Sequence, residues 1–158
     1  MWFTGMWRSE ELVQGVRCVE GRDIEEQTSQ STRVHSTWAG LAFERLCLQH
    51  VDQIKRALQI GGVLTNEHAW YSPAAQIDLL IDRDDGIINL CEMKFDEGLH
   101  VISKREAEDV LRKKLALKEE TATRKAIYVT YVTAEGLKRN SYANDVQSEV
   151  VLDDLFGR

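Results

Sequence analysis

Three charged residues interrupt apolar stretches of the sequence, namely Asp78 in AQIDLLID and Glu92 and Lys94 in IINLCEMKF. Burying such charges is costly unless they are paired or bound to a metal ion. Two neighbouring carboxylates suit Mg²⁺ or Mn²⁺, hard cations that take oxygen ligands and keep water and substrate phosphate in their shell. The three residues therefore indicate a metal-dependent site for phosphodiester hydrolysis, with Asp78 and Glu92 as the ligands.

The amine at position 94 has a natural role in such a site. A divalent metal lowers the pKa of a bound water and neutralises charge on the scissile phosphate. Lys94 would orient or deprotonate that water, or stabilise the transition state by its positive charge. Glu44, on an upstream helix, is a further candidate ligand, directly or through water; the alternative is an exposed helix charge paired with Arg45 or Gln49. Both interpretations of Glu44 stay open.

A predicted β-hairpin must bring these residues together. The two apolar runs flank the four-residue turn RDDG, which is a strong hairpin signal. Side chains alternate along a strand, so Glu92 and Lys94 project to one face. With this turn Ile81 pairs near Ile88, and Asp78 pairs near Cys91 or Glu92. A slip of one residue would turn Asp78 to the opposite face.

The remaining periodicities predict an α, β, β, β, α, β order with a further short strand. The expected helices cover residues 37–58, stopped by Gly61-Gly62, and 104–120; the expected strands cover 63–71, 126–132 and 149–152. A hairpin followed by a helix and a strand implies an antiparallel meander, then a crossover to a parallel neighbour. The prediction is an α/β fold whose mixed central sheet is flanked by helices.

This order, with Asp78 followed by Glu92-Met93-Lys94 and with Glu44 on the preceding helix, resembles the PD-(D/E)XK nuclease superfamily and its restriction-endonuclease-like αβββαβ core. The segments WAGLAFERLCLQHVDQIKRAL and AQIDLLIDRDDGIINLCEMKF look like the nuclease-like C-terminal domain of bacterial P-loop ATPases of the archaeal-ATPase type. The likeness covers roughly residues 38–156. It implies a Mg²⁺- or Mn²⁺-dependent DNA nuclease, with Asp78, Glu92 and Glu44 as metal ligands and Lys94 as the catalytic lysine.

The sequence also departs from that family. Ile77 stands where the motif has proline, and the preceding loop, residues 71–75, is short. No G-x-x-x-x-G-K-[ST] motif occurs, so nucleotide binding is not carried over. The ATPase part is absent from this sequence.

Length and composition indicate how many domains the chain contains. With 158 residues and 43% hydrophobic content the chain has room for one domain, expected at residues 34–158. Residues 1–33 are expected to be an N-terminal extension or linker, because GRDIEEQTSQSTR is polar and aperiodic; the aromatic start suggests the remnant of an upstream domain. Three scattered cysteines favour a reducing, cytoplasmic location without structural zinc. The start MWFTGMWRSEEL lacks the pattern of a signal peptide and no run reaches membrane-spanning length, so we expect neither a signal peptide nor a membrane span.

The expected partner is DNA. A net charge of −6 argues against bulk coating of nucleic acid, so contact would come from a local patch. The alternative is a catalytically inactive nuclease-fold module, formerly attached to an ATPase, that binds DNA or a protein partner; a separate ATPase and a homodimer also stay open.

Three further expectations concern individual residue types. The four histidines lack ligand spacing and are expected at surface or half-buried positions. The basic residues at 104–118 alternate with acids, which predicts a solvated, salt-bridged face. Trp38 and Trp70 are expected in the core.

Overall fold

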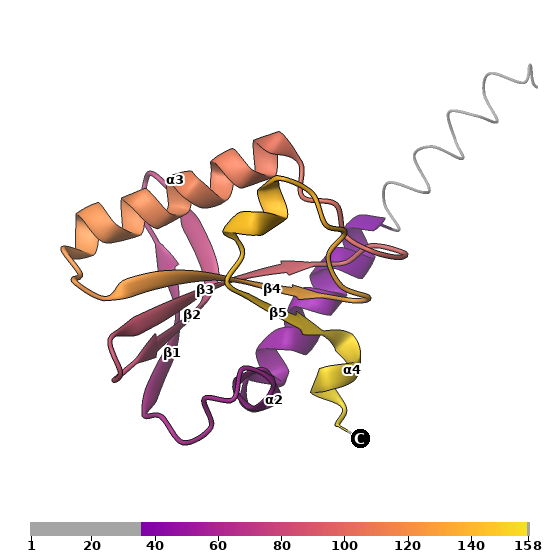
Figure 1. Cartoon of the computed structure of the whole chain (residues 1–158), viewed down its shortest axis with the longest axis horizontal. Coiled ribbons are helices and arrows are strands. Elements are labelled where there is room, and N and C mark those ends of the chain that lie inside the picture. The colour runs from indigo at the N-terminus through magenta and orange to yellow at the C-terminus, as the bar shows by residue number, and fades with distance from the viewer. Residues whose placement is uncertain (1–35, 158) are drawn as a thin grey trace, which may run out of the picture. The chain divides into compact units, whose positions relative to one another are not determined.

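A five-stranded mixed sheet carries helices on both faces in the computed structural model, which describes residues 36–157 (Figure 1). The strands are β1 (Thr65–Tyr71), β2 (Gln76–Arg83), β3 (Ile87–Lys94), β4 (Ala126–Thr133) and β5 (Ser148–Val151). The helical segments are residues 36–49, α2 (Val51–Ala57), α3 (Lys104–Thr121), the 3₁₀ turn η1 (Tyr142–Asp145) and α4 (Leu152–Leu155). The predicted α/β class and the predicted mixed sheet flanked by helices are confirmed.

The strands lie in chain order across the sheet. β1, β2 and β3 form the antiparallel meander, and β4 and β5 continue the sheet in parallel. The parallel step from β3 to β4 passes through α3, as the crossover rule predicts. Gly86 closes the β2–β3 turn with a φ of +87°, a left-handed conformation that favours glycine.

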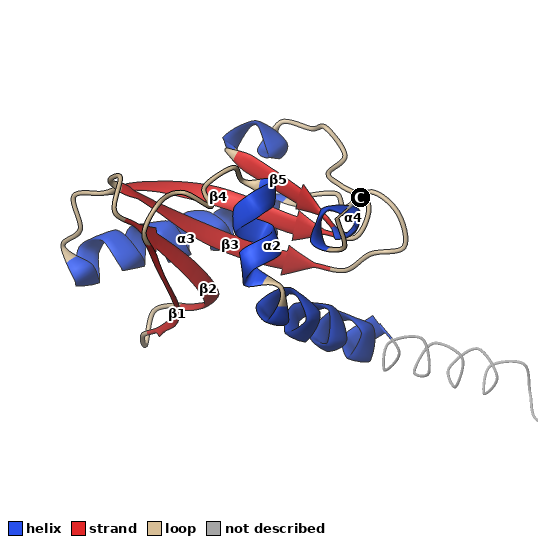
Figure 2. Ribbon diagram, turned by 90° about the horizontal axis from the view of Figure 1, so that it is seen from below, coloured by secondary structure: helices blue, strands red, loops and turns tan. Residues whose placement is uncertain are grey.

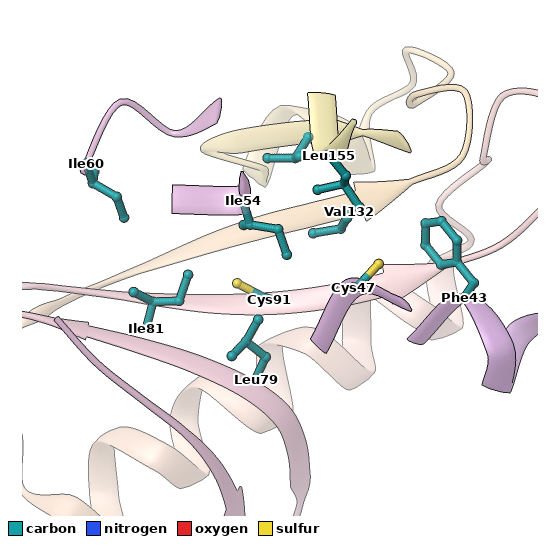
Figure 3. Close-up of a cluster of buried hydrophobic side chains, with 10 residues drawn as sticks. Phe43, Cys47, Ile54, Ile60, Leu79, Ile81, Cys91, Val132 and Leu155 are labelled. Carbon is teal, nitrogen blue, oxygen red and sulfur yellow. The ribbon is translucent and has the colours of Figure 1, made fainter. Parts of the chain in front are cut away.

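Each face of the sheet has its own apolar layer. In Figure 2, α3 covers one face, while residues 36–49 and α2 cover the other. The second layer joins the helices to β2, β3, β4 and β5 through buried side chains (Figure 3): Phe43, Cys47, Ile54, Ile60, Leu79, Ile81, Cys91, Val132, Val150 and Leu155. The thiols of Cys47 and Cys91 are free and buried within it, as expected for cysteines that act as small hydrophobes. Burial raises the pKa of Cys47 to about 12.

The first predicted helix is broken at His50, in the middle of its regular apolar spacing. The prediction of one continuous helix was wrong, because His50 leaves the helical conformation at φ −117° and ψ 31°. Its ring Nδ1 lies 2.8 Å from the Leu46 carbonyl oxygen, so the side chain takes a backbone acceptor of the helix. The predicted stop at Gly61-Gly62 was also wrong: α2 ends at Ala57, and Gln59 adopts a left-handed φ of 58°.

The two tryptophans differ in burial. Trp70 packs against the α3-side core, but Trp38 is 70% exposed, so its expected core position was wrong. The expected extension at residues 1–33, together with Cys18 and His35, lies outside the described residues. Within residues 36–157, no helix combines the length and the apolar character needed to cross a membrane.

Ile54 offers a direct test of the helix-side core, since its side chain is fully buried there. Replacement by alanine removes apolar contacts and leaves a cavity, so Ile54→Ala should lower the free energy of unfolding by about 2–5 kcal/mol in urea denaturation. Leu48→Ala, at a site that is 40% exposed, is the control and should change it by less than about 1 kcal/mol. Equal losses in both variants would contradict the assigned core.

Candidate metal-dependent active site

The pairing of β2 and β3 ends next to Asp78 and Glu92, the predicted metal ligands. Their pairing runs from Asp82↔Ile88 to Leu79↔Cys91, and the next residues along the two strands are Asp78 and Glu92. β3 continues beside β4 as far as Lys94↔Thr133. Ile81 pairs with Asn89, the residue next to the expected Ile88. Continuing this pairing by one residue places Asp78 opposite Glu92, one of the two positions expected for it.

A β-bulge reorients this end of β2. Its pairing with β1 shifts between His68↔Leu80 and Trp70↔Ile77, so two residues of β2, Asp78 and Leu79, face one residue of β1. As a result Ile77 and Leu80 both join the α3-side core although they are three positions apart, whereas Leu79 joins the core on the other face. A bulge that re-aims a side chain is common near active sites.

Glu92 is buried and held by two lysines. Its carboxylate is 6% exposed; Oε1 lies 2.5 Å from Lys113 Nζ and Oε2 lies 3.4 Å from Lys94 Nζ. The predicted common face of Glu92 and Lys94 is therefore confirmed, and Cys91 and Met93 pack in the opposite core. The paired ammonium groups offset the cost of burying the Glu92 charge.

Asp78 and Glu44 form the second part of the site. Burial is the main cause that raises the pKa of the Glu44 carboxyl; the negative charge of Asp78 raises it further, and the ammonium of Lys94 lowers it. Glu44 thus lies within electrostatic reach of two of the three motif residues. Asp78 also accepts a hydrogen bond of 2.8 Å from Gln76 Nε2. Both carboxylates are half-buried.

The carboxylates are neighbours without forming a closed metal cage. Between Ser36 and Gly157, no group of three or more His, Cys, Asp or Glu residues is close enough together to hold a metal ion. The donor chemistry still suits a hard cation, because all three candidates offer carboxylate oxygens and the charges of Glu44 and Asp78 repel each other. The candidate residues form two groups. In one, Glu92 pairs with Lys94 and Lys113; in the other, Asp78 interacts electrostatically with Glu44. Lys94 also interacts electrostatically with Glu44 and so interacts with both groups.

The side chain of Lys94 borders a cavity at the surface. A cavity of about 680 Å³ lies between Lys94 and the first turns of α3, where Arg105 and Glu106 line it. Arg112 from the same helix contacts the Ala74 carbonyl oxygen and the Asp109 carboxylate, which ties α3 to the short loop before Asp78. The side chain of Lys94 is therefore accessible from the α3 side.

A buried histidine lies next to this cavity, contrary to the expectation of a surface or half-buried position. His100 is 8% exposed and pairs through Nδ1 with Asp96 and through Nε2 with Glu106 Oε1 at 3.0 Å. The Tyr131 hydroxyl donates to Glu106 Oε1 at 3.0 Å. Burial, and then the charge of Glu106, raise the pKa of Tyr131. These contacts anchor the loop between β3 and α3.

Lys113 is the site residue that the sequence interpretation missed. The alternation of basic and acidic residues predicts a solvated position for Lys113, but its side chain is only 13% exposed. Its signal was present in the spacing: Lys113 lies three residues after Val110 and four before Leu117, both buried. A lysine on the inward stripe of an amphipathic helix indicates a buried acidic partner.

Comparisons with known proteins leave the function open. No protein-family model and no curated protein matches the sequence. The chain is similar to the crystal structure of AF1548, a protein of unknown function, with 20% identity and a TM-score of 0.43. The match covers 66% of this chain and 56% of that one, so the chain spans about half the length of AF1548. The nuclease resemblance therefore stays a prediction.

The electrostatic link between Glu44, Asp78 and Lys94 can be measured by ¹³C-carboxyl NMR titration of Glu44. Asp78→Asn removes a negative neighbour, so the pKa of Glu44 should fall toward its ordinary value. Lys94→Met removes a positive neighbour, and the pKa should rise. A titration midpoint that neither variant moves would contradict the arrangement of the three residues.

Proposed function

We propose that the chain is a Mg²⁺- or Mn²⁺-dependent phosphodiesterase that cleaves DNA. The proposal is supported by the placement of Asp78 and Glu92 next to the last β2–β3 pair, with Lys94 Nζ 3.4 Å from Glu92 and with Glu44 in electrostatic range of Asp78 and Lys94. Asp78 and Lys94 stay partly exposed there, beside the buried carboxylate of Glu92. A buried acid next to partly exposed charged groups suits chemistry on a bound substrate.

Asp78 and Glu92 would hold the divalent ion, and Glu44 would assist directly or through water. The metal supplies an activated water and neutralises charge on the phosphate. Lys94 is the group able to reach substrate, since it is 37% exposed and borders the 680 Å³ cavity. Its ammonium would orient the attacking water or stabilise charge on the phosphate in the transition state.

The substrate class follows from the chemistry of the site together with the resemblance to PD-(D/E)XK nucleases. The net charge of −6 leaves local contacts as the means of binding DNA, and Arg105 beside Lys94 is placed to contribute one. A cytoplasmic location fits this assignment.

A second candidate is a catalytically quiet module that binds DNA or a protein partner, including a separate ATPase or a second copy of the chain. One observation favours it: each oxygen of Glu92 already faces an ammonium group, so the ion pairs are complete without a metal. Calorimetry with millimolar Mn²⁺ separates the candidates. Heat of binding that disappears in Asp78→Asn supports the nuclease, and no binding to the unmodified chain supports the quiet module.

The nuclease proposal predicts that the purified chain nicks or degrades DNA with Mg²⁺ or Mn²⁺ but not with EDTA. Lys94→Ala should slow cleavage by about 10²–10⁴-fold, because it removes a group that acts on the water or the transition state. Lys118→Ala, on the exposed side of α3, should cleave like the unmodified chain. Equal cleavage by Lys94→Ala in a folded sample would assign the activity to a contaminant.

A further inference from the structure

Glu92 has one more ammonium partner than its charge requires. Lys113 Nζ lies 2.5 Å from Oε1, and Lys94 Nζ lies 3.4 Å from Oε2. One carboxylate carries a single negative charge, so two lysines leave the cluster with excess positive charge. Asp109 offsets part of it, with Oδ2 at 3.6 Å from Lys113 Nζ. The two lysines therefore need not serve the same purpose.

Lys113 and Lys94 differ in their exposure and in the contacts that they make. Lys113 is 13% exposed, lies on the inward stripe of α3 and contacts two carboxylates, so its ammonium is held in place. Lys94 is 37% exposed, stands at the last position of β3 and makes the longer contact with Glu92. Of the two, Lys94 is free to leave Oε2, whereas Lys113 is enclosed at Oε1.

We infer that Lys113 is a positioning residue that fixes the Glu92 carboxylate through Oε1 and leaves Oε2 for a divalent cation. With a divalent cation bound, Lys94 would give up its contact with Oε2, and its ammonium would be available to the phosphate. This inference rests on the proposed function, because it assigns a role to Glu92 as a metal ligand. Partners that hydrogen-bond a ligating carboxylate set its orientation, and their loss typically weakens metal binding by about 10–100-fold.

Removal of a lysine near Glu92 can raise or lower the affinity for Mn²⁺, and the direction of the change shows which role that lysine has. A positive charge close to a divalent ion repels it, so a lysine that competes for the metal position would strengthen binding when removed. A lysine that orients the ligand would weaken binding when removed, because Glu92 is left buried and without a fixed direction. We expect Lys113 to orient Glu92, so its removal should weaken Mn²⁺ binding.

The experiment measures Mn²⁺ affinity by electron paramagnetic resonance on the full chain, together with the steady-state kinetics of DNA cleavage. Lys113→Met should weaken Mn²⁺ binding about tenfold or more. Lys113→Arg, which keeps the charge, should recover part of that affinity. Lys114→Met is the matched control: the neighbouring lysine lines a separate cavity beside Ile102 and Val129, and its loss should leave Mn²⁺ affinity unchanged.

The outcomes separate this inference from the proposed function. Unchanged or tighter Mn²⁺ binding in folded Lys113→Met overturns the positioning role, while the nuclease proposal stands if Asp78→Asn still abolishes binding. No Mn²⁺ binding by the unmodified chain overturns both. Circular dichroism checks the fold, and Lys113→Gln, which keeps a hydrogen-bond donor without the charge, replaces Lys113→Met if that variant does not fold.

Discussion

The structure depends on one buried charge. Glu92 interrupts β3 between two apolar cores, and its carboxylate is almost fully removed from water. A lone buried carboxylate is unfavourable by several kcal/mol, so the fold must supply partners. It does so from β3 itself through Lys94 and from the crossover helix through Lys113. The need to pair Glu92 therefore links the position of α3 to the centre of the sheet.

The bulge in β2 has a complementary effect on the other carboxylate. It shifts the alternation at Asp78, so that this residue interacts electrostatically with Glu44 on the first helix while the apolar residues on either side stay buried. Carboxylates from three elements thus come to one end of the sheet, and Lys94 interacts with two of them. The apolar layers cover both faces of the sheet, and Asp78 and Glu92 follow the last pair of β2 and β3 at its end.

The elements that could be predicted are those with strong local signals. The RDDG turn between apolar runs identified the hairpin, and the regular spacing of α3 identified the crossover and with it the parallel step to β4. Structural features that depend on long-range contacts could not be predicted from the sequence. The bulge at Asp78 and the exposure of Trp38 depend on neighbours that are distant in sequence. The break at His50 accompanies a local contact of its ring with the Leu46 carbonyl, which the apolar spacing of the helix does not reveal. Lys113 could be missed because a basic residue among acids usually lies on a solvated helix face, although its place between Val110 and Leu117 indicates burial.

A crystal soaked in Mn²⁺ and measured at the manganese absorption edge shows directly whether Asp78 and Glu92 bind a metal together. A metal-dependent site predicts an anomalous peak in contact with carboxylate oxygens of both residues, with Lys94 displaced from Glu92 and Lys113 still bound to it. A crystal saturated with Mn²⁺ that shows no peak at these carboxylates, and leaves both lysines on Glu92, would contradict the metal-dependent site.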